Sequence, residues 1–110
     1  MVEKLYLGID IGTYESKGVL VNITGRIIAQ SKKGHQLIVP QKGWAEHRPL
    51  EDWWEDFVYI CRDLINKSGC QNSDIKAVTT SAIGPCMLPV NTAGKPLMNS
   101  VLYGVDTRAF

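Results

Sequence analysis

Two apolar strands around a short polar loop are predicted by residues 5–21, Leu5-Tyr6-Leu7-Gly8-Ile9-Asp10-Ile11-Gly12-Thr13-Tyr14-Glu15-Ser16-Lys17-Gly18-Val19-Leu20-Val21. Gly8 and Gly12 allow the backbone to approach a ligand closely, and the N–H groups around Gly12 and Thr13 can converge on an anion. Asp10, at the exit of the first strand, can reach a hydrated Mg²⁺. The loop therefore predicts a site for the phosphate end of ATP.

Short links extend this strand pair into a larger sheet. Strand-like runs cover 5–11, 17–22 and 26–30, and the turns between them are too short for a crossover helix. The three strands are therefore expected to form an antiparallel meander. The third strand is expected either to end near residue 30 or to continue through 35–39 after a kink near Gly34.

The clearest periodicity in the chain predicts a helix over residues 49–68. Pro49 suits the first helical position, and Gly69 suits a left-handed stop. Apolar residues recur at helical spacing and predict one core-facing stripe: Leu50, Trp53, Trp54, Phe57, Val58, Cys61, Leu64 and Ile65.

A further strand is predicted over 75–81, after the helix. Because a long helix between two strands usually makes the second parallel to an earlier one, the sheet is expected to be mixed. Residues 86–90 and 100–103 predict another strand pair, around a turn at 91–96.

Composition limits the chain to one compact domain and a small-molecule partner. It has 110 residues, 45% of them hydrophobic, and a net charge of +1 without a basic run. Electrostatics therefore give no support for binding nucleic acid or an anionic membrane. No apolar stretch approaches the roughly 20 residues that span a bilayer, and the expected location is cytoplasmic.

Cysteine and histidine spacing predicts no metal centre. Cys61, Cys70 and Cys86 are odd in number and lack C-x-x-C spacing, which disfavours disulfides and zinc and favours buried, reduced thiols. His35 and His47 have no third ligand at useful spacing.

The predicted meander, helix and parallel strand, with Asp10 at the first turn, resemble the start of a ribonuclease H-like, actin-like ATPase domain. Gly8-Ile9-Asp10-Ile11-Gly12-Thr13, with Lys17 four residues on, resembles the first phosphate motif of sugar kinases, actin and Hsp70 chaperones. Residues 40–54, with Gly43-Trp44-Ala45-Glu46 and Trp53-Trp54, resemble the FGGY carbohydrate kinases more narrowly. Gly94-Lys95-Pro96 and Tyr103-Gly104-Val105-Asp106-Thr107-Arg108 fit patterns of the same family.

This resemblance implies that residues 1–110 form the first part of the N-terminal actin-like lobe of such a kinase. The rest of that lobe and the C-terminal lobe would be absent, together with the family's catalytic Asp, which takes the proton from the acceptor hydroxyl. The implied reaction is ATP-dependent phosphoryl transfer to a sugar or polyol. The chain is expected to be inactive alone, as an expressed fragment or the product of a truncated reading frame.

The resemblance also implies roles for individual residues. Asp10 would bind Mg²⁺ through water, or else serve as a turn carboxylate. Gly12 and Thr13 would contact the phosphates, or else form an ordinary hairpin turn. Lys17 would add positive charge near the γ-phosphate, or else be a solvated strand residue.

Two residues are implied on the acceptor side. Tyr103 would lie beside the substrate or pack against the lobe, and Asp106 would contact the substrate or pair with Arg108. Residues 81–86, Ser81-Ala82-Ile83-Gly84-Pro85-Cys86, lack the polar side chains that xylulokinases and glycerol kinases carry there, which disfavours both xylulose and glycerol as the substrate.

Two alternatives remain open. The chain could be a non-catalytic actin-like or Hsp70-like lobe that uses nucleotide to switch conformation. It could also be an assembly module that forms a homodimer through an exposed sheet edge.

Overall fold

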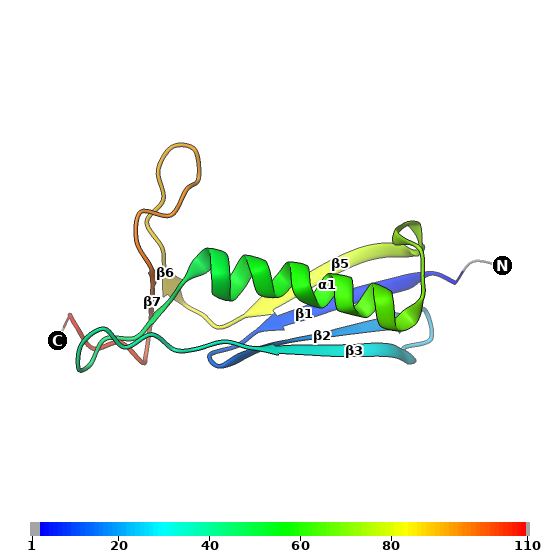
Figure 1. The fold of residues 1–110 in the computed structure, drawn as a ribbon, viewed down its shortest axis with the longest axis horizontal. Helices are drawn as coiled ribbons and strands as arrows, with labels where there is room; N and C mark the ends of the chain where they lie inside the picture. The colour runs from blue at the N-terminus through cyan, green and yellow to red at the C-terminus, as the bar shows by residue number, and fades with distance from the viewer. Residues whose placement is uncertain (1–2, 110) are drawn as a thin grey trace.

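The computed structural model describes residues 3–109, and its elements follow the predicted order (Figure 1). A three-strand segment comes first, a single long helix follows, and short strands end the chain. In chain order the elements are β1 Leu5–Ile11, β2 Glu15–Asn22, β3 Ile27–Gly34, β4 Glu46–His47, a π-helical segment Pro49–Trp54, α1 Glu55–Ser68, a 3₁₀ turn Asn72–Asp74, β5 Ile75–Ala82, β6 Cys86–Met87 and β7 Ser100–Leu102.

The main sheet is mixed, with strand order β3-β2-β1-β5. β1 and β2 pair antiparallel, as do β2 and β3, whereas β5 returns parallel to β1 after the helix. The predicted meander and crossover are therefore confirmed. The prediction that the third strand could continue through 35–39 is wrong, because β3 ends at Gly34. Within 35–39, Ile38 forms an isolated bridge to Glu46.

The core lies between α1 and one face of the main sheet. Side chains alternate along each strand, so only every second residue faces the helix. The buried apolar cluster is Leu5, Leu7, Ile9, Leu20, Ala29, Ile60 and Leu64. The opposite sheet face carries Gly8 and Asp10 from β1, and β5 is largely exposed. Figure 1 shows the helix on one side of the sheet only.

The expected apolar stripe of the helix is only half right. Leu64 is fully buried as predicted, but Leu50 is 56% exposed and Trp54 is 59% exposed. Ile60, which the predicted stripe left out, is fully buried. The π-helical segment contributes to this difference, since its wider turn, in which the Glu55 N–H donates to the Leu50 oxygen, changes the phase of the residues before α1. Two carboxylates, Asp52 and Asp56, take the inward positions instead.

Gly18 sets how closely α1 packs on β2. A Cβ atom built on Gly18 would overlap Cγ2 of Ile60 and lie 3.2 Å from Cδ1 of Leu64. Both side chains are fully buried and have no room to retreat. The absence of a side chain at residue 18 is therefore a packing requirement.

Replacing Gly18 by alanine is expected to lower the free energy of unfolding by about 1–3 kcal/mol, because the added methyl overpacks the interface between α1 and β2. Urea titration of the chain followed by circular dichroism measures the change. Gly34→Ala is the matched control, since a Cβ there meets nothing within 4 Å. Equal stability of the two variants would contradict the packing argument.

A small second sheet, of order β4-β7-β6, lies beyond the carboxyl ends of β1 and β5 (Figure 1). It gives the chain an elongated outline of 57 × 28 × 20 Å. The predicted strand pair at 86–90 and 100–103 is confirmed in shorter form by β6 and β7. Among residues 3–109, no helix is both long and apolar enough to cross a lipid bilayer.

Candidate phosphate site

Strand register places Asp10 and Lys17 side by side. Asp10 lies opposite Lys17 in the antiparallel pair of β1 and β2, and beside Ser81 in the parallel pair of β1 and β5. Residues in register share a face, and here it is the face that α1 does not cover. The Ser81 hydroxyl donates to Oδ1 of Asp10 at 2.8 Å, which orients the carboxylate.

These side chains border a depression of about 290 Å³ on the open face of the sheet. Gly8 of β1 lies in its floor and places no side chain on this face of the sheet. Lys17 Nζ lies 3.1 Å from Oε1 of Glu15, and the Lys17 side chain is 63% exposed. Because an exposed pair of this kind is weak, Lys17 can turn toward an anion in the depression.

The loop between β1 and β2 is tight. The Gly12 N–H donates to the Glu15 oxygen at 2.9 Å, and a Cβ on Gly12 would lie only 3.0 Å from that same oxygen. Gly12 therefore permits the close turn that carries Thr13. The roles predicted for Gly12 and Thr13 in phosphate binding stay predictions.

Asp10 has the chemistry expected of a magnesium ligand. Mg²⁺ keeps several waters and needs only one or two protein carboxylates when a nucleotide supplies phosphate oxygens. Asp10 is exposed, and Ser81 engages one of its two oxygens. No group of three or more His, Cys, Asp or Glu side chains within 3–109 is arranged as a metal cage. A single carboxylate thus fits a hydrated ion and does not fit a structural metal.

Tyr103 and Asp106 lie together, away from Asp10. Both line a pocket of about 770 Å³ beside β6 and β7. Tyr103 is 73% exposed. Asp106 accepts hydrogen bonds from Arg108 and from the Ala45 N–H, and the Arg108 guanidinium holds the pKa of this carboxyl far below its usual range. The ion pair with Arg108 is therefore present, and substrate contact by either residue stays a prediction.

Arg108 ties the end of the chain to the segment before the helix. Its guanidinium lies 3.9 Å from the ring centre of Trp44 and donates to Oε2 of Glu46 at 2.7 Å. It also donates to Asp106. The Gly-Trp-x-Glu stretch and the Asp-x-Arg stretch that the sequence singled out separately thus form one structural cluster.

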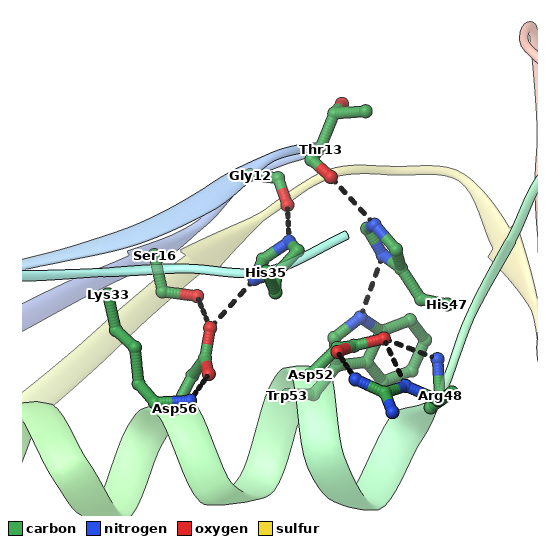
Figure 2. Close-up of polar contacts among 10 residues, drawn as sticks. All are labelled: Gly12, Thr13, Ser16, Lys33, His35, His47, Arg48, Asp52, Trp53 and Asp56. Atoms are coloured by element: carbon green, nitrogen blue, oxygen red, sulfur yellow. Dashed lines mark hydrogen bonds and ion pairs between the residues drawn. The ribbon is translucent and has the colours of Figure 1, made fainter. Parts of the chain in front are cut away.

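A buried polar network beneath the loop was missed from the sequence (Figure 2). Asp56 on α1 accepts hydrogen bonds from Ser16 at 2.8 Å and from Nδ1 of His35 at 2.7 Å, and Lys33 pairs with its other oxygen at 3.1 Å. Nε2 of His35 donates to the Gly12 carbonyl at 2.8 Å. Both ring nitrogens of His35 thus face oxygen atoms, one of the Asp56 carboxylate and one of the Gly12 carbonyl.

His47 completes the network from β4. Its Nε2 donates to the Thr13 carbonyl at 2.8 Å, and its Nδ1 accepts from the Trp53 indole N–H at 3.1 Å. One nitrogen must donate and the other must accept, so the ring is neutral with its proton on Nε2. Burial agrees with this, since it lowers the pKa of His47 below the ordinary 6.5. The sequence contained one sign of this polar network: two carboxylates, Asp52 and Asp56, lie four residues apart on the predicted helix.

The chain is expected to lose stability as the pH falls below about 6.5, because unfolding releases His47 from a site that favours its neutral form. The unfolded chain then binds more protons than the folded chain, whereas above this pH the contribution of His47 is complete. His35, Asp52 and Asp56 also face this ring and modulate the effect. Urea titrations at pH 5 and pH 7.5 measure it.

His47→Gln is the control for this pH dependence, since glutamine retains a donor for Thr13 but does not titrate. The pH dependence of the variant should be shallower than that of the unaltered chain. Identical slopes would show that His47 does not contribute.

The fold and this site together define a class of protein. A three-strand antiparallel meander, a crossover helix and a parallel fourth strand, with a carboxylate at the first turn, form the opening part of a ribonuclease H-like domain of the actin-like ATPase type. The family model described as "FGGY family of carbohydrate kinases, N-terminal domain" matches residues 5–109. The chain belongs to this family of carbohydrate kinases.

Curated relatives agree with this assignment. The glycerol kinase of Trichodesmium erythraeum (strain IMS101) is 32% identical over 102 residues, which are 92% of this chain and 20% of that protein. The xylulose kinase of Bacillus subtilis (strain 168) is 31% identical over 105 residues, which are 96% of this chain and 21% of that protein. The chain thus spans about one fifth of the length of these relatives.

Solved structures show the same fold. The ligand-bound xylulose kinase from Lactobacillus acidophilus matches with a TM-score of 0.79 at 31% identity, covering 89% of this chain and 19% of that one. The Plasmodium falciparum glycerol kinase with ADP matches with a TM-score of 0.78 at 20% identity, covering 96% of this chain and 21% of that one. The predicted fold class and family are confirmed.

Proposed function

We propose that this chain supplies the phosphate and magnesium side of an ATP site in a kinase that phosphorylates a hydroxyl of a sugar or polyol. One observation carries the proposal. Asp10 and Lys17 stand in register on the open sheet face, next to the loop that carries Gly12 and Thr13. A carboxylate, an ammonium and free backbone donors are the groups that a metal-bound polyphosphate requires.

Each group has a limited role in this proposal. Asp10 holds Mg²⁺ through water, Thr13 and the loop backbone bind phosphate oxygens, and Lys17 offsets negative charge. Bound Mg²⁺ would neutralise charge on the transferred phosphoryl group. The residues of this chain position the donor, since catalysis of phosphoryl transfer rests on alignment and charge neutralisation.

The acceptor is a sugar or polyol of undefined identity. In this proposal Tyr103 and Asp106 border the acceptor side, from the pocket beside β6 and β7. Ile83, Gly84 and Pro85 provide no polar side chain, so hydroxyl groups there must be held by backbone groups or by other parts of the protein. Neither glycerol nor xylulose is favoured by this segment.

Residues 1–110 act in this proposal as the first part of an N-terminal lobe. The relatives are about five times longer, and the base that accepts the hydroxyl proton is expected outside these residues. The chain alone should therefore not phosphorylate any polyol or sugar. Detectable ATP-dependent transfer by the purified 110-residue chain would contradict this part of the proposal.

A panel of polyols and sugars tests the proposed function. Each candidate acceptor is incubated with Mg·ATP and the full-length product. This term means the polypeptide encoded by the complete reading frame around these residues. Release of ADP that depends on one acceptor supports the proposal and identifies the substrate class. Failure of the full-length product to bind Mg·ADP, measured by calorimetry, would overturn it.

A further inference from the structure

We propose that His35 and His47 are positioning residues that hold the loop between β1 and β2 with its backbone N–H groups turned outward, as a preformed anion site. This inference rests on the proposed function, because it assigns the outward N–H groups to a nucleotide phosphate. It starts from two consecutive carbonyls, those of Gly12 and Thr13. Each accepts a hydrogen bond of 2.8 Å from Nε2 of one histidine.

The histidines approach these carbonyls from the helix side. Nδ1 of His35 is bound by Asp56, and Nδ1 of His47 is bound by Trp53. Figure 2 shows both rings between the loop and the helical segment, with the two carbonyl oxygens pointing toward them. The rings themselves meet edge to face, with centroids 4.8 Å apart. Two histidine rings in mutual contact therefore support the loop, each through one hydrogen bond to a loop carbonyl.

The direction of the carbonyls fixes the direction of the next N–H groups. In a trans peptide the C=O and the following N–H point in opposite directions. The Gly12 carbonyl points to His35, so the Thr13 N–H points away from the helix. By the same geometry the Thr13 carbonyl points to His47 and the Tyr14 N–H points outward. Both donors therefore point away from the histidines, and Asp10 lies on the sheet face that α1 does not cover.

These two donors are free to bind a ligand. The Gly12 N–H is occupied by the Glu15 oxygen, and the Tyr14 carbonyl accepts from the His35 N–H. Within residues 3–109, the N–H groups of Thr13 and Tyr14 make no hydrogen bond to another protein group. Successive outward N–H groups form a concave anion site of the kind that phosphates occupy.

The supports under the loop are themselves fixed. The His35 side chain is 2% exposed and that of Asp56 is fully buried. The Trp53 indole N–H determines which nitrogen of His47 carries the proton, so that Nε2 is the donor toward Thr13. If Nδ1 carried the proton instead, the Nε2 lone pair would face the Thr13 oxygen and repel it. Because the observed arrangement fixes the loop before a ligand arrives, binding of phosphate requires little reorganisation of the loop.

Calorimetric binding of Mg·ADP to the full-length product tests this arrangement. His47→Leu removes the donor to Thr13 and is expected to weaken Mg·ADP binding by about tenfold, since a misaligned N–H loses a charge-assisted hydrogen bond. His47→Gln keeps a terminal donor and should bind within about twofold of the unaltered protein. Binding of adenosine, which has no phosphate, should be the same for both variants.

Arg48→Met is the matched control for damage to the same region. Arg48 pairs with Asp52 next to His47 but does not touch the loop. The variant should bind Mg·ADP like the unaltered protein. Equal Mg·ADP affinity of His47→Leu and the unaltered protein would overturn the inference and leave the proposed function standing. Absence of Mg·ADP binding by the unaltered protein would instead overturn both.

A measurement on the unaltered protein covers the case in which His47→Leu does not fold. Gly12-Thr13 is the only Gly-Thr pair among residues 1–110. In the full-length product labelled with ¹³C-carbonyl glycine and ¹⁵N-threonine, the Thr13 amide is the Gly-Thr resonance that disappears in the Thr13→Ser variant. That amide resonance should shift strongly when Mg·ADP saturates the protein and little when adenosine does. An unmoved Thr13 amide under saturating Mg·ADP also overturns the inference.

Discussion

The Asp10→Asn variant of the full-length product is expected to lose about 10²–10³-fold in kcat/KM for Mg·ATP. A bound metal contributes several kcal/mol of charge stabilisation in the transition state, and each 1.4 kcal/mol is about a tenfold change in rate. Asparagine has the same shape as aspartate but no negative charge, so it holds the hydrated ion poorly. Coupled ADP-release assays over a range of Mg²⁺ concentrations measure the loss.

The structure provides a way to separate the charge of Asp10 from its position. Ser81 donates to Oδ1 of Asp10, a bond that the asparagine oxygen can also accept. Asp10→Asn should therefore fold normally, with the melting temperature of the unaltered protein. Ser81→Ala is the control, which keeps the charge and removes only the orienting bond, and it should lose much less activity. An Asp10→Asn variant with unchanged rate would remove the metal role from this residue.

Replacing Asp56 by alanine is expected to lower the free energy of unfolding of the chain by about 3–5 kcal/mol. Asp56 is fully buried and is the common partner of Ser16, Lys33 and His35. Its removal leaves two buried donors and a cation without their acceptor, and such losses cost far more than exposed ion pairs. Since small domains are stable by only about 5–15 kcal/mol, much of the chain would be near unfolding.

Asp63→Ala is the matched control, because Asp63 is another carboxylate on α1 with a serine and a lysine as partners. Ser31 donates to it at 2.6 Å, and Lys67 pairs with it at 2.9 Å. Its side chain remains 25% exposed, so water can replace these partners. Urea titration should show a much smaller loss for Asp63→Ala than for Asp56→Ala. Similar losses would show that burial of Asp56 does not determine its contribution.

Local patterns explain why much of the fold could be predicted. The alternation in residues 5–22 and the short turns leave little choice but a meander, and the long helix forces β5 to return parallel. The position of Asp10 at the exit of β1 follows from the same pattern. Each of these features depends on neighbours in the chain, which a sequence displays directly.

The polar network could not be predicted because its contacts are distant in the chain. His35 is 23 residues from Gly12, and His47 is 34 residues from Thr13. An isolated histidine gives no sign of the carbonyl it will meet. The helix stripe failed for a related reason, since Asp52 and Asp56 turn inward only when partners from other elements compensate their charge.

The pairing of β4 with β7 determines when, during synthesis, His47 can take its place beneath the loop between β1 and β2. His47 belongs to β4, which pairs with β7 at Ser100–Leu102. Arg108 then clamps the adjoining Trp44 and Glu46. A nascent polypeptide that has released only its first ninety residues from the ribosome carries the meander and the helix, but not the strand that anchors His47. The hydrogen-bonded support beneath the loop between β1 and β2 is thus completed only after residues 100–108 have emerged.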